Sequence, residues 1–222
     1  MLQAFRDGLA RTAAAPVVAV GVWAVARLLT VAPPDAFVEA AEPRDAIVQL
    51  LFWSFAWGGV LDRYARNRPT RARGFFGACG AHLGALLRLG AIVWLLSAGV
   101  RTLAGPWPIL AVSLIATYAR VRVVVEDRRS ALGALLAAAR FLWRNPAGVV
   151  LFALYAVPAQ LTHPFQGRSV LISLLALVSH ATAVSLFQSR LAHAGYTAAP
   201  TIDWPESPAA EAISNAPPDY PS

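Results

Sequence analysis

The chain has 222 residues, of which 57% are hydrophobic and 14% are charged, and its formal net charge at pH 7 is +7. Its mean hydropathy of +0.54 is too high for an ordinary water-soluble domain of this length. The composition therefore excludes a fully water-exposed protein and predicts an all-α integral membrane protein.

Six apolar stretches are candidates for membrane-spanning helices. A helix needs about 20 apolar residues to cross a hydrocarbon core of about 30 Å. Four stretches meet this length: Thr12–Val31, Leu83–Val100, Trp107–Val125 and Ser169–Phe187. Two more, Ala46–Leu61 and Ala147–Leu161, are slightly short and can cross only if flanking residues lie at the interface. For the last of these a half-span or a kinked helix stays open, because Pro158 lies near its end.

The arginines indicate how such helices are oriented, since cytoplasmic loops are rich in basic residues. With the N-terminus inside, 14 of the 19 basic residues, all of them arginine, fall on the inner side. We therefore predict about six spans with both termini cytoplasmic. A cleaved signal peptide is the competing interpretation of the first stretch, but Arg27 interrupts its apolar region and Pro33 would follow the cut.

Between the stretches Trp107–Val125 and Ala147–Leu161 the sequence predicts an amphipathic helix at Ser130–Trp143. Ser130 is a suitable N-cap, and Asn145-Pro146 ends the pattern. Apolar residues recur at helical spacing and are expected to share one face: Leu132, Leu135, Leu136, Ala139, Leu142 and Trp143. At about 1.5 Å per residue this helix is about 20 Å long, which suits a position in the cytoplasmic interface.

The C-terminal segment differs in character from the rest of the chain. Residues 198–222 include six prolines and four acidic residues and have no basic residue. Such a segment cannot bury a core, so we expect a helical membrane domain at 1–197 followed by an acidic, proline-rich disordered tail.

The tripeptide Tyr-Ala-Arg occurs twice, at 64–66 and 118–120, each time after an apolar stretch and before several arginines. A tyrosine suits the inner membrane boundary, where we expect its ring among the headgroups and its hydroxyl in water. A weak internal duplication stays open. The arginines near this boundary are candidates for contacts with the headgroups of anionic lipids. They are Arg66, Arg71, Arg73, Arg120, Arg122, Arg128, Arg129, Arg140 and Arg144. They act either as general anchors and topology signals or as a shaped phosphate site.

One ionisable residue falls near the middle of a predicted span. His180 lies in the last stretch, with Ser173 two turns before it and Thr182 close behind. A histidine in this position either forms hydrogen bonds between helices or handles protons along a pathway.

The sequence offers no catalytic or metal-binding motif. It contains no HExxH, no Cys/His cluster, no GxSxG and no phosphate-binding glycine loop. The arginines follow the sides of a membrane instead of forming the basic face of a folded module, which argues against nucleic-acid binding. We therefore expect no enzyme activity, no metal and no cofactor.

Three stretches resemble parts of a group of uncharacterised bacterial polytopic membrane proteins: "GGVLDRYARNRPTRARGFF", "YARVRVVVEDRRSALGALLAAARFLWRNP" and "FQSRLAHAGYTAAPTIDWPESPAAEAI". The segment "VEDRRSALGAL" is more faintly similar to the membrane domain that accompanies some glycerophosphodiester phosphodiesterases. The resemblance implies a helical protein of the bacterial inner membrane and carries over no catalytic residue.

From these features we expect a non-catalytic scaffold or accessory subunit that contacts anionic lipid and a membrane-protein partner. The alternative is a component of a small-solute or lipid transporter.

Overall fold

The computed structural model describes residues 2–28, 43–67, 71–104, 107–161 and 168–193. The regular structure in these ranges is helical, with no strand, which confirms the all-α prediction for them. The helices are α1 (Leu2–Ala13), α2 (Pro16–Leu28), α3 (Pro43–Arg66), α4 (Ala72–Ala104), α5 (Trp107–Val125), α6 (Ala131–Arg144), α7 (Ala147–Leu161) and α8 (Arg168–His193).

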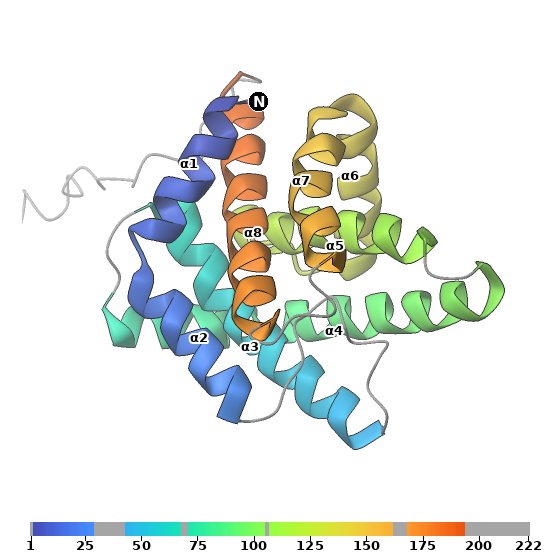
Figure 1. Ribbon diagram of the computed structural model, residues 1–222, viewed down its shortest axis with the longest axis horizontal. Coiled ribbons are helices and arrows are strands. Elements are labelled where there is room, and N and C mark those ends of the chain that lie inside the picture. The colour runs from blue at the N-terminus through green and yellow to red at the C-terminus, as the bar shows by residue number, and fades with distance from the viewer. Residues whose placement is uncertain (1, 29–42, 68–70, 105–106, 162–167, 194–222) are drawn as a thin grey trace, which may run out of the picture. The chain divides into compact units, whose positions relative to one another are not determined.

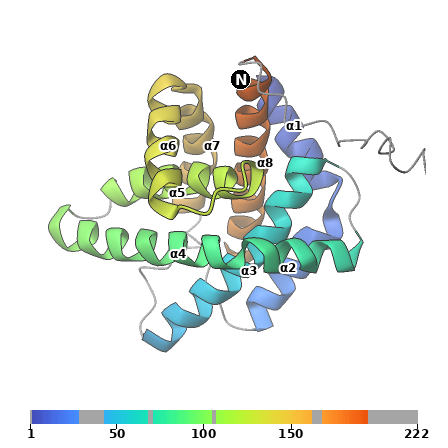
Figure 2. The ribbon, with the colours of Figure 1, turned by 180° about the vertical axis from the view of Figure 1, so that it is seen from behind.

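The chain divides into two units, residues 1–187 and 188–222, and the packing described below belongs to the first. Within it, α4 packs between α3 and α5, and α5 also contacts α6 and α7. The neighbouring helices α6 and α7 form a hairpin that runs across the direction of α4 and α5 (Figure 1 and Figure 2). The expected tail, 198–222, lies outside the described residues.

Helix α3 supplies much of the core of this unit. Trp53, Trp57, Val60 and Leu61 on this helix are each at most 2% exposed. The glycine at 58 lets α4 approach closely, because a Cβ there would lie 3.0 Å from the backbone oxygen of Ala78. The small residue therefore sets the contact between α3 and α4.

The number of helices that suit a membrane crossing differs from the prediction. Three in the described ranges are long and apolar enough: Ala72–Val100, Pro108–Val125 and Ile172–Leu191. The bent pair Leu2–Ala13 and Pro16–Val25 makes a fourth if it counts as one span. About six spans are therefore not supported. The apolar part of α3 is short because Asp45 and Asp62 bound it, and the 15 residues of α7 extend only about 22 Å.

The first predicted span, Thr12–Val31, is not one straight helix. The structure breaks it after Ala13, and α2 starts at Pro16 at an angle of 71° to α1. Proline lacks the backbone N–H that a continuous helix needs and its ring clashes with the preceding turn. Proline is tolerated at the first position of a helix, so Pro16 starts α2 instead of continuing α1.

Two arginines connect α1 and α3 through the carbonyl groups at their ends. Arg11 of α1 donates from Nη1 to the backbone oxygen of Tyr64 at 2.7 Å. Arg63 of α3 donates from Nη2 to the backbone oxygen of Ala14 at 3.3 Å. Carbonyl groups at a helix C-terminus lack intrahelical partners, so each arginine stabilises the end of the other helix.

The predicted amphipathic helix is confirmed as a helix, and its N-cap is also confirmed. Ser130 has extended backbone angles, and its hydroxyl accepts a hydrogen bond from the Gly133 N–H at 3.2 Å. At the other end the Asn145 N–H donates to the Leu142 carbonyl.

The two faces of α6 differ from the expected pattern, in which the leucines and Trp143 share one face. The side turned toward the protein consists of Ala131, Ala134, Ala138 and Leu142. The large residues Leu132, Leu136 and Trp143 point outward and are 62%, 62% and 92% exposed. Small alanines allow α6 to pack close to α5, which leaves the large apolar side chains on the outer surface.

Candidate functional site

The three polar residues predicted within the last span are all buried on α8. His180 is 2% exposed, Ser173 is 5% exposed and Thr182 is 1% exposed. The His180 Nδ1 atom lies 2.8 Å from the backbone oxygen of Ala176, one turn earlier. Its Nε2 atom faces Nη1 of Arg120 on α5 at 3.5 Å, the long end of the hydrogen-bond range. The ring therefore links α8 to α5.

These two contacts determine which nitrogen of His180 carries the proton. A backbone carbonyl only accepts hydrogen bonds, so Nδ1 must donate to Ala176. A guanidinium only donates, so Nε2 must accept from Arg120. The geometry assigns His180 as a neutral ring protonated at Nδ1. A second proton, on Nε2, would place two cations next to each other in a buried site.

The face of the His180 ring stacks on an aromatic side chain of α3. The rings of Trp57 and His180 have centroids 3.7 Å apart and an interplanar angle of 21°. Trp53 stacks in turn on Trp57, at 5.7 Å and 29°. The histidine is thus fixed by α3 on one side and by Arg120 at its edge, and this arrangement suits a structural role.

Thr182 and Ser173 do not join His180 in one hydrogen-bond network. The Thr182 hydroxyl lies 3.0 Å from the hydroxyl of Tyr155 on α7. Gly8 of α1 packs against the same threonine, and a Cβ on Gly8 would lie 2.8 Å from the backbone nitrogen of Thr182. Ser173 is buried two turns before His180 on the same face of α8. Thr182 therefore contacts α1 and α7, separately from the contact of His180 with α5.

The basic residues predicted to form one cytoplasmic surface fall into different environments. Arg120 is only 5% exposed and faces His180, so its assignment to the surface group is wrong. Arg120 lies within α5, as the predicted stretch Trp107–Val125 implies, but the helix turns its side chain toward α8 instead of toward the surface. Arg122 also belongs to α5, where it pairs with Glu126 at 3.1 Å and lies over the Phe187 ring at 5.1 Å.

The other arginines of the predicted group lie nearer the surface. Arg66 pairs with Asp62 at 2.8 Å, and Arg128 pairs with Glu126. The remaining five are exposed: Arg71, Arg73, Arg129, Arg140 and Arg144. Arg71 and Arg73 lie at the start of α4, Arg129 precedes α6, and Arg140 and Arg144 lie in its last turns.

The two Tyr-Ala-Arg copies occupy unlike positions. Both tyrosines are buried, Tyr64 at 0% and Tyr118 at 2% exposure, so neither presents its hydroxyl to water as expected. The first copy ends α3, and Asn67 follows with a positive φ of 48°. The second copy lies inside α5, where its arginine is buried. The repeat therefore does not mark two equivalent membrane boundaries.

The site provides no metal-binding group within the described ranges, where no three His, Cys, Asp or Glu side chains come together. The fold and the site define a class of protein: its described segments are helical, three or four of their helices are apolar enough to cross a membrane, and they form a buried arginine–histidine contact. Comparison of the chain with protein-family models, with curated proteins and with solved structures finds no match.

Proposed function

We propose that this protein is a non-catalytic multi-pass component of the bacterial inner membrane, a scaffold or accessory subunit whose basic cytoplasmic face contacts anionic lipid. The observation that supports this most is the outer surface of α6. There Leu132, Leu136 and Trp143 are largely exposed, beside the exposed Arg140 and Arg144. Apolar side chains next to basic ones are typical of a helix that lies in a membrane interface.

The energetics favour lipid as the neighbour of this surface. Apolar area that leaves water gains about 25 cal/mol per Å². Three large side chains on one helix therefore contribute more when they enter the acyl boundary than when they stay in water. Basic residues near an anionic leaflet add about 1 kcal/mol each. Arg140 and Arg144 lie one turn apart, so both can reach headgroups at the same depth.

The proposal includes the orientation of the chain. With the N-terminus inside, Arg73 faces the cytoplasm only if α3 crosses the membrane, and Arg190 faces it only if α7 crosses as well as α8. Helix α3 has 24 residues, but its apolar part, 46–61, is only about 24 Å long, so this helix also crosses only with flanking residues at the interface. Helix α7 is shorter and crosses only with flanking residues at the interface. Both termini are then cytoplasmic.

Lipid binding is tested with purified protein in mild detergent. Phosphatidylglycerol and phosphatidylcholine are added separately, and retained lipid is counted by native mass spectrometry. We expect preferential retention of phosphatidylglycerol, reduced in the double variant Arg140→Gln/Arg144→Gln. Arg6→Gln, an exposed change on α1, serves as the control. Equal retention of the two lipids by the parent protein would contradict the proposal.

A second double variant separates general attraction from a shaped phosphate site. Arg140→Lys/Arg144→Lys keeps the charge but lacks the planar fork with which a guanidinium binds two phosphate oxygens. We expect this variant to retain phosphatidylglycerol like the parent. Loss of the lipid in the lysine variant would indicate a shaped site.

A further inference from the structure

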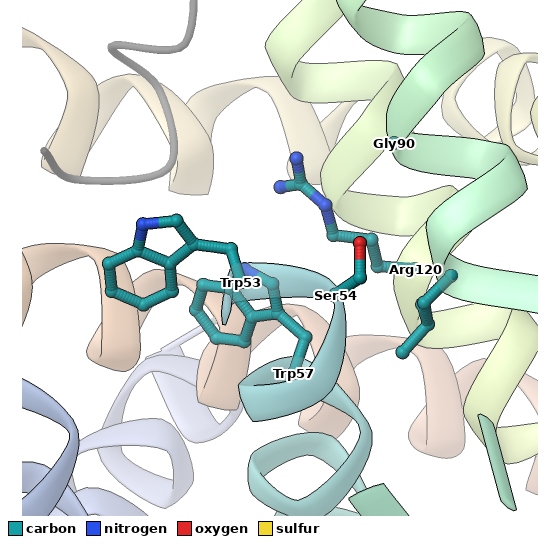
Figure 3. Close-up of a pocket in the computed structure, with 6 residues that line it drawn as sticks. Trp53, Ser54, Trp57, Gly90 and Arg120 are labelled. Carbon is teal, nitrogen blue, oxygen red and sulfur yellow. The ribbon is translucent and has the colours of Figure 1, made fainter. Parts of the chain in front are cut away.

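A small cavity lies between α3, α4 and α5, next to the arginine–histidine contact. It is lined by Trp53, Ser54, Trp57, Leu86, Gly90 and Arg120, and its volume is about 10 Å³, room for a single particle the size of water (Figure 3). Arg120 extends toward it from α5, and the hydroxyl of Ser54 lies on the same side of α3 as the arginine (Figure 3).

The polar groups around the cavity are mainly hydrogen-bond donors. Arg120 only donates, and so does the indole N–H of Trp57. Trp57 is 2% exposed, and its Nε1 atom has no hydrogen-bond partner within the described residues. Ser54 is also buried, at 5% exposure, and its hydroxyl can donate or accept. A buried N–H such as that of Trp57 is normally satisfied, so the lining favours an occupant that accepts hydrogen bonds.

We propose that this cavity is a binding site for one small anion of the halide class. A water molecule would have to place two hydrogens, but the only side-chain acceptor in the lining is the Ser54 oxygen. A halide accepts from every donor and has no hydrogen to place. It also brings a negative charge next to the Arg120 guanidinium, where the low dielectric of the interior strengthens their attraction.

The glycine at position 90 keeps the space open. A Cβ there would lie 2.6 Å from Cδ1 of Leu50 and 3.4 Å from Oγ of Ser54. Alanine at this position would therefore narrow the cavity from the α4 side while leaving all its donors in place. The neutral His180 accepts from Arg120 and thereby holds the guanidinium near the cavity.

This site does not depend on the lipid contacts proposed above, and its test uses the full chain in detergent with chloride as the probe. Thermal unfolding is followed in sodium chloride and in sodium gluconate at equal ionic strength, since gluconate is too large for the cavity. We expect the Tm to rise with the logarithm of the chloride concentration above the Kd, by a few degrees at ten times the Kd. A Tm that does not depend on chloride would overturn the proposal and leave the cavity to a water molecule.

Two variants test whether chloride binds in this cavity. Trp57→Phe keeps an aromatic ring against His180 but removes the N–H, and we expect the Kd for chloride to increase by about tenfold or more. Gly90→Ala narrows the cavity and should weaken the chloride response in the same direction. Trp94→Phe, on α4 and outside the lining, is the control and should keep the parental Kd. Retention of the parental Kd by either Trp57→Phe or Gly90→Ala would place the ion elsewhere and contradict the assignment.

Discussion

The Nη1 atom of Arg120 lies 3.5 Å from the Nε2 atom of His180, with both side chains buried in the first unit of the chain. The contact fixes the protonation of the histidine, because the guanidinium can only donate. It also fixes the position of the guanidinium beside the cavity. A residue expected on the surface and a residue expected in the membrane interior thus form one buried pair.

Replacement of this histidine should destabilise the protein substantially. His180→Ala removes the acceptor for Arg120 and the ring that stacks on Trp57, and leaves a cavity at a site that is 2% exposed. We expect a loss of about 2 kcal/mol or more, seen as a lower Tm in detergent. Gln3→Ala, an exposed change on α1, should leave the Tm nearly unchanged. Equal Tm values for the two variants would contradict the packing described for His180.

The protonation of His180 can be observed directly. Nitrogen-15 NMR of histidine-labelled protein should show one ring that is neutral and protonated at Nδ1 at pH 7, because Nδ1 faces a carbonyl oxygen at 2.8 Å. The resonance is assigned by its disappearance in His180→Ala. A neutral ring protonated at Nε2 would show that Arg120 does not donate to it.

The contact between α1 and α8 should depend on the absence of a side chain at position 8. Gly8→Ala places a Cβ 2.8 Å from the backbone of Thr182, which cannot move aside like a flexible side chain. We expect a cost of about 1–3 kcal/mol and a lower Tm. Gly21→Ala on α2 is the matched change, since a Cβ there meets nothing within 4 Å. Its Tm should be equal to or above that of the parent, because alanine favours a helix over glycine.

The helix positions were largely predictable from the sequence, but the environments of their side chains were not. Apolar run lengths located α5 and α7, and the Ser130 cap located the start of α6, because these features are local. The sequence placed Arg120 within the stretch Trp107–Val125 but near its inner end, and this position suggested a surface residue, because the run length does not show which way a side chain points. The valines at 121 and 123–125 were the available signal that Arg120 has apolar surroundings.

The bend between α1 and α2 and the packing faces of α6 differ in how far the sequence predicts them. Pro16 was a visible sign of the break between α1 and α2, since proline cannot continue a helix. The faces of α6 carried no such sign. Leucine and alanine are both apolar, and only the close approach of α5 decides that Ala134 and Ala138 turn inward while Leu132 and Leu136 turn outward. The contact of Trp57 with His180 joins residues far apart in the chain, and periodicity cannot predict it.

The cap of α6 should contribute measurably to the stability of this helix. Ser130→Ala removes the acceptor for the Gly133 N–H, and we expect a cost of about 1 kcal/mol. Ser130→Asp supplies a carboxylate acceptor at the same position and should restore the parental value. Hydrogen exchange at the first turn of α6 measures the effect locally, and it should be faster in the alanine variant only. Equal protection in the alanine variant and the parent would show that the hydroxyl contributes nothing.

The orientation of the basic loops is the central claim, and reporter fusions after Arg73, Arg144 and Arg190 test it most directly. Each fusion carries either a reporter that is active only in the cytoplasm or one that is active only in the periplasm. If both α3 and α7 cross the membrane, all three positions are cytoplasmic, so the cytoplasmic reporter should be active at each and the periplasmic reporter inactive. A periplasmic signal at Arg73, Arg144 or Arg190 would show that the helices before that position cross an odd number of times, and would contradict the account.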